Sequence, residues 1–71
     1  MSADQGPDPT STAAELAAVS ETIERSRERV SALAEPYLGT ERDDIVAALY
    51  EAERTLLGAE RTLQRARKVV R

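Results

Sequence analysis

Apolar and small residues recur at alternating steps of four and three along residues 45–70. This is the spacing of a heptad repeat, which places all such residues on one side of an α-helix. Residues 12–37 follow the same alternation over an equal length. The pattern therefore predicts two amphipathic helices, each with an apolar stripe that needs a partner. The large residues of these stripes are Leu16, Val19, Ile23, Val30, Leu33 and Tyr37 in the first helix and Ile45, Leu49, Leu56, Leu63 and Val70 in the second.

The two stripes match each other in an antiparallel register. When two antiparallel helices pack, the numbers of facing residues have a constant sum, and here Tyr37 with Ile45 and Thr12 with Val70 both give 82. The same register sets Arg27 beside Glu53 as an opposite-charge neighbour. The sequence thus predicts an all-α fold, a coiled-coil-like antiparallel two-helix hairpin. Its layers would place a small residue opposite a large one: Ala52, Ala59 and Ala66 facing Val30, Ile23 and Leu16.

Residues 1–11 are rich in glycine, proline and small polar side chains, and we expect a disordered tail there. The first helix is predicted over about 12–37, starting with Thr12 as N-cap and Glu15 three residues later as the second half of a capping box. Ser11 is an alternative cap. The hairpin domain would then span 12–71.

Pro36 lacks an amide hydrogen and crowds the preceding turn, so the first helix should kink or tighten there. Gly39 suits the left-handed conformation that ends many helices. The bend is predicted over 38–41, and the second helix over about 41–70, with Thr40 as its N-cap and Asp43 in its first turn. The register centres the reversal at the same place, because half of 82 is 41.

The residue inventory argues against enzymatic activity. The chain has no histidine and no cysteine, so it offers neither an imidazole base nor a thiolate nucleophile, and we expect no cofactor and no metal. No apolar run approaches the roughly 18 residues of a membrane span, and residues 1–10 do not resemble a signal peptide. We expect a cytoplasmic protein.

The net charge of −3 is unevenly distributed. Residues 1–24 carry only acidic charges, and the C-terminal end carries only basic ones. In a hairpin these ends lie together, so mutual neutralisation is one interpretation, and an acidic partner or nucleic acid is the alternative, with nucleic acid the less expected of the two. The basic residues of this candidate binding end are Arg61, Arg65, Arg67, Lys68 and Arg71.

The predicted bend is acidic, with Glu41, Asp43 and Asp44 at the tip of a rod about 40 Å long. In outline this is similar to the coiled-coil hairpins of Gre-type transcript-cleavage factors. That resemblance implies a tip that presents carboxylates to a polymerase. Complementing the helix dipole is the simpler interpretation of the same residues.

A lone two-helix hairpin is marginally stable, because the apolar side chains of its stripes offset only part of its conformational entropy. Apolar residues beside the stripes suggest a remedy, because they lie on one side of the hairpin. We therefore expect a homodimer in which two hairpins pack into a four-helix bundle. The proposed dimer patch consists of Ala34, Leu38, Val46, Tyr50 and Leu57.

The sequence favours a small non-enzymatic module for protein–protein interaction or scaffolding that self-associates through its hairpins. The alternative is a regulator that docks on a larger machine, either the transcription apparatus or nucleic acid, through the basic end or the acidic bend.

Overall fold

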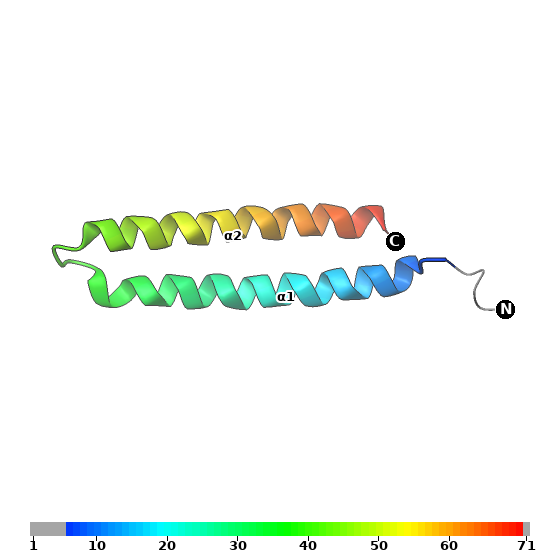
Figure 1. Cartoon of the computed structure of the whole chain (residues 1–71), viewed down its shortest axis with the longest axis horizontal. Coiled ribbons are helices and arrows are strands. Elements are labelled where there is room, and N and C mark those ends of the chain that lie inside the picture. The colour runs from blue at the N-terminus through cyan, green and yellow to red at the C-terminus, as the bar shows by residue number, and fades with distance from the viewer. Residues whose placement is uncertain (1–5, 71) are drawn as a thin grey trace.

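The computed structural model describes residues 6–70 and contains two long helices packed side by side. Helix α1 spans Pro9–Ala34 and α2 spans Asp43–Val69, with the short 3-10 helix η2, Glu35–Tyr37, after α1. The helices run antiparallel, and residues 6–70 contain no strand (Figure 1). The expected all-helical hairpin is confirmed.

Helix α1 begins earlier than the sequence indicated. Asp8 is the N-cap, with an extended backbone (φ −106°, ψ 111°), and its Oδ1 accepts a hydrogen bond from the Thr10 amide at 3.0 Å. Pro9 takes the first helical position, where its missing amide hydrogen costs nothing. The predicted start at Thr12, with Ser11 or Thr12 as cap, is therefore wrong, because proline favours helix initiation at this position. The predicted tail lies partly in residues 1–5, outside the described residues.

The end of α1 follows the sequence. The chain tightens into η2 around Pro36, and Gly39 adopts a left-handed conformation with φ +76°. A β-carbon at Gly39 would meet no atom within 4 Å, so the glycine is required by its backbone angle and not by crowding.

Thr40 stabilises the turn instead of capping α2. Its hydroxyl donates to the Tyr37 carbonyl at 2.7 Å and accepts from the Arg42 amide at 3.1 Å. Arg42 is the N-cap of α2 and makes no side-chain capping bond. The second helix thus starts two residues later than predicted, because the threonine hydroxyl is already engaged within the bend.

The helix–helix interface is rotated from the predicted one. On α1, Val19 is 42% exposed and Leu33 is 59% exposed, although both were expected inside. Their neighbours Ser20 and Ala34 are buried instead. Each helical residue advances about 100° around the axis, so this one-residue change turns the buried side of α1 toward the following position.

Helix α2 is rotated in the same sense. Ala52 and Ala59, predicted to face α1, are exposed, whereas Glu53 and Glu60 are half-buried. The expected small–large layers at these two alanines are therefore wrong. Three of the six large residues of the first predicted stripe and all five of the second remain partly covered: Leu16, Ile23, Val30, Ile45, Leu49, Leu56, Leu63 and Val70 are half-buried, whereas Val19, Leu33 and Tyr37 are exposed.

Candidate functional site

The rotation gives the hairpin two unlike long faces. One face is closed by small and charged residues that enter the helix–helix interface, and we call it the closed face. It is formed by Ser20, Arg27 and Ala34 of α1 with Glu53 and Glu60 of α2.

Arg27 links the two helices at the middle of the closed face. Its Nη1 lies 2.9 Å from Glu53 Oε2, and its Nε lies 3.1 Å from Glu60 Oε1. The side chains are 26%, 25% and 12% exposed, respectively. The hydrogen bond to Glu53, helped by the charge of Glu60, raises the pKa of Arg27 above its ordinary value, while desolvation acts against this shift. One guanidinium thus binds two carboxylates of the other helix, and these contacts favour one register of α1 against α2.

The sequence predicted the first of these contacts and missed the second. Arg27 does lie beside Glu53, as the register indicated. Glu60 follows Glu53 by one heptad and therefore lies on the same side of α2. The seven-residue spacing of Glu53 and Glu60 could therefore have indicated the second contact. An arginine side chain is long enough to reach along the helix axis to both carboxylates.

Two small residues complete the closed face. Ala34 is fully buried, and within residues 6–70 it is the one buried hydrophobic residue. Ser20 is 8% exposed, and its hydroxyl oxygen has no hydrogen-bond partner in the described part of the chain. A buried hydroxyl without a partner lowers stability, so Ser20 is a weak point of this interface.

The predicted dimer patch lies on this closed side. Ala34 is buried within the hairpin itself, and Val46 and Leu57 are half-buried, so these three are not available as an external surface. Leu38 and Tyr50 are exposed, and they line one shallow depression together with residues of α1. The patch is largely the hairpin's own interface, because the helices turn toward these apolar residues.

The opposite long face is uncovered and nearly uncharged, and we call it the open face. Residues of both helices line one depression there, including Thr12 of α1 with Val69 and Val70 of α2. Residues at steps of three, four and seven from these positions lie on the same side of each helix and complete the open face. Its exposed positions are Thr12, Glu15, Val19, Thr22, Arg29 and Leu33 on α1 and Ala48, Ala52, Thr55, Ala59, Thr62 and Val69 on α2, and it also includes the half-buried Ser26, Ile45 and Ala66.

Glu15 and Arg29 are the two charged residues of the open face, although 32% of the whole chain is charged. Neither takes part in an ion pair within residues 6–70. The large apolar side chains at Val19, Leu33 and Val69 are exposed on the same face, the last of them by 81%. The open face therefore combines exposed apolar side chains with few charges.

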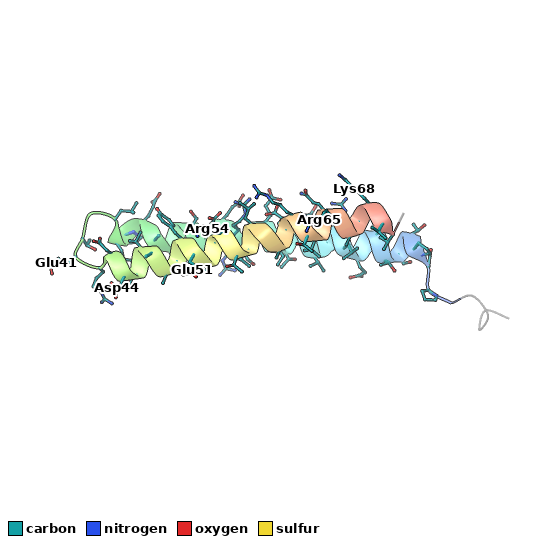
Figure 2. All side chains as sticks on the ribbon, turned by 90° about the horizontal axis from the view of Figure 1, so that it is seen from above. Glu41, Asp44, Glu51, Arg54, Arg65 and Lys68 are labelled. Atoms are coloured by element: carbon teal, nitrogen blue, oxygen red, sulfur yellow. The ribbon has the colours of Figure 1, made fainter. Side chains whose placement is uncertain are left out.

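The basic end of the hairpin is exposed. Arg65 and Lys68 project from the end of α2 away from the bend, and Glu41 and Asp44 mark the opposite end (Figure 2). Of the five predicted basic residues, Arg61, Arg65, Arg67 and Lys68 are exposed, and Arg71 lies outside the described residues.

The four described cations of the basic end make no ion pair within residues 6–70. The acidic residues of α1 were expected to neutralise them. Heptad position explains the difference: Glu15 belongs to the open face, whereas Arg67 lines a depression of the closed side with Ala13. Glu15 and Arg67, at the same level of the hairpin, thus lie on opposite faces.

The acidic bend is partly neutralised by its own arginine. Arg42 Nη2 lies 2.9 Å from Asp44 Oδ2, and Arg42 Nε lies 3.0 Å from Oδ1. This bidentate contact lowers the pKa of Asp44 and raises that of Arg42. Glu41 and Asp43 are exposed. Residues 6–70 contain no group of three or more acidic side chains arranged to hold a metal ion.

Neither described helix combines the length and apolar character needed to cross a membrane. The chain matches no protein-family model, no curated protein and no solved structure. The surfaces of the hairpin are therefore the basis for inferring its function.

Proposed function

We propose that this chain is a small non-enzymatic interaction or scaffold module that self-associates into a homodimer, with two hairpins packed as a four-helix bundle. The proposal requires no cofactor. It assigns function to the surfaces of the rod and not to a chemical centre.

The main support for this proposal is the small amount of side-chain surface that the hairpin buries. Within residues 6–70, no large side chain is fully buried. Two-helix packing leaves one side of every helix in water, and a core this small seldom supplies the stability of a folded domain. A second hairpin would bury the remaining apolar side chains and supply the missing core.

Size-exclusion chromatography with light scattering at micromolar concentration tests this proposal. We expect twice the chain mass of 7.8 kDa together with a helical circular dichroism spectrum. A helical, cooperatively unfolding species of single-chain mass would contradict it.

The exposed cations at the end of α2 favour a second candidate, a regulator that docks on an acidic partner or nucleic acid through this end. Retention on heparin at about 50 mM salt, lost on charge reversal of Arg65, Arg67 and Lys68, would support it. Charge reversal of Arg25 and Arg54, which lie away from the basic end and from the open face, is the control. Absence of retention at that salt concentration would remove this candidate.

A further inference from the structure

We propose that the open face binds the open face of a second copy of this chain, with the two bends at opposite ends of the dimer. This inference rests on the proposed self-association and specifies its surface and its symmetry. It replaces the patch around Leu38 and Tyr50 as the contact between copies.

The open face has the size that a stable dimer needs. Its helices are about 40 Å long at 1.5 Å per residue. Two packed helices are about 20 Å wide, since their axes lie 8–10 Å apart. Covering this rectangle removes on the order of 800 Å² from each copy, which is the standard contribution of one partner.

The face is also shaped for close packing. Ser26, Ala52 and Ala59 leave shallow positions between the exposed side chains of Val19 and Leu33. Large side chains of one copy can enter the shallow positions of the other, as in the layers of a helical bundle.

Charge fixes the orientation of the second copy. A two-fold axis across the hairpin, at the level of residue 22, brings Glu15 of each copy opposite Arg29 of the other, because 15 and 29 average to 22. This level is within one residue of the middle of α1, which runs from 9 to 34. The α1 helices of the two copies therefore overlap along their whole length.

The same axis matches the shallow positions with the large ones. Its two-fold relation places Val19 near Ser26 of the other copy, and Thr12 near Leu33. The level of residue 22 corresponds to residue 60 on α2 in the register that places Thr12 beside Val70. Ala59 then meets its own counterpart at the centre of the dimer, where two small residues allow α2 of each copy to approach closely.

The other face-to-face arrangement, with both bends at one end, lays α1 of one copy on α2 of the other. The open face of α2 carries no charge within the described residues. Glu15 and Arg29 would then be covered by apolar residues without a partner, which is costly for a charge. The charges thus select opposite bends.

The first test compares two pairs of exposed apolar residues on opposite faces. Val19→Glu with Leu33→Glu should weaken the dimer at least about a hundredfold, as expected when apolar residues of an interface are replaced by like charges. Leu38→Glu with Tyr50→Glu is the matched control on the closed side and should leave dimer affinity within about threefold. Light scattering over a dilution series measures both, and circular dichroism verifies that each variant is helical.

A wild-type chain that is monomeric would defeat the proposed function together with this inference. A wild-type dimer that survives Val19→Glu with Leu33→Glu would overturn only the inference. So would a dimer that the control pair dissociates.

Cross-linking provides a second measurement that does not depend on disruptive variants. The chain contains no cysteine, so a single introduced thiol is unambiguous. Ala59→Cys should give a covalent dimer on a non-reducing gel, because the two thiols lie beside the axis. Gly58→Cys, one residue away and outside the interface, should not. Equal cross-linking of both variants, or of neither, would overturn the inference.

Charge exchange tests the orientation. Glu15→Arg should weaken the dimer about threefold to tenfold, and adding Arg29→Glu should restore it, because each contact pairs opposite charges again. A double variant no tighter than Glu15→Arg would exclude opposite bends.

Discussion

The two long faces of the hairpin use different physical means. The closed face joins α1 and α2 with an arginine between two carboxylates and with small residues that let the helices approach. The open face leaves Val19 and Leu33 in solvent and carries two charges. The difference teaches that directional contacts can specify the fold within one chain while apolar side chains of the same chain stay exposed on the other face.

The strongest test of this contrast is a charge at the most buried point of the closed face. Ala34→Glu should lower the free energy of unfolding by more than about 3 kcal/mol, because it buries a carboxylate without a partner. Ala32→Glu, two residues away and exposed, should change it by no more than about 0.5 kcal/mol. Urea unfolding followed by circular dichroism measures both. Equal effects would show that Ala34 is not inside the interface.

The next test asks whether the ion pairs of Arg27 only stabilise the closed face or also prevent it from binding a second copy. Arg27→Met should lower the urea midpoint, because Glu53 and Glu60 lose their shared partner. The triple variant with Glu53→Met and Glu60→Leu should recover the midpoint, since apolar residues can replace a partly buried ion cluster.

The triple variant would, however, have two apolar faces. We expect its mass distribution in light scattering to become broad or higher than that of the wild type, whereas Arg27→Met alone should not show this. A triple variant with wild-type mass and a single species would show that the charges do not restrict self-association to one face.

A smaller effect is expected at Ser20. Ser20→Ala should raise the free energy of unfolding by about 1 kcal/mol, because it removes a buried hydroxyl without a partner. Ser31→Ala, at an exposed position of α1, should gain only about 0.5 kcal/mol from helix propensity. Thermal unfolding of the two variants at equal concentration measures the difference. A larger gain at Ser31 would contradict the burial of Ser20.

The smallest effect lies at the bend. The contact with Arg42 holds the pKa of Asp44 below its ordinary value of 3.8. A group with a lowered folded pKa stabilises the fold above its unfolded pKa, and this contribution is lost as the pH falls through the folded pKa. Arg42→Gln should therefore raise the pKa of Asp44 and weaken the acid dependence of stability below pH about 4. An NMR titration measures the shift, with Arg54→Gln as the control that leaves it unchanged.

The sequence was sufficient for the fold because local chemistry and long-range register agreed. Pro36 and Gly39 placed the end of α1, and the constant sum placed the reversal at the same point. The start of α1 was misplaced because two rules compete at Pro9. Proline disfavours helix at the residue before it, yet it is well suited to be the first helical residue itself.

The rotation of the helix–helix interface could not be predicted from the pattern of hydrophobic residues. A periodic pattern assigns Val19 and Leu33 to the inside and Arg27 to the outside, because it scores each residue alone. The energy of Arg27 depends on two acidic residues far away in sequence, which neutralise it as a group. The apolar residues Val46 and Leu57 beside the predicted stripe were the sign of the rotation, since they point to the side toward which the helices turn.

The single reversal at Gly39 also sets the order in which the hairpin closes. Contacts beside the bend join residues close in sequence, and each step toward the termini adds two residues to the loop that must be closed. Contacts between the helices should therefore form first at the bend and then extend toward the termini. Amide hydrogen exchange should be fastest at the end away from the bend, where Thr12 and Val70 line one depression. The basic end of α2 thus belongs to the part of the rod that opens most readily.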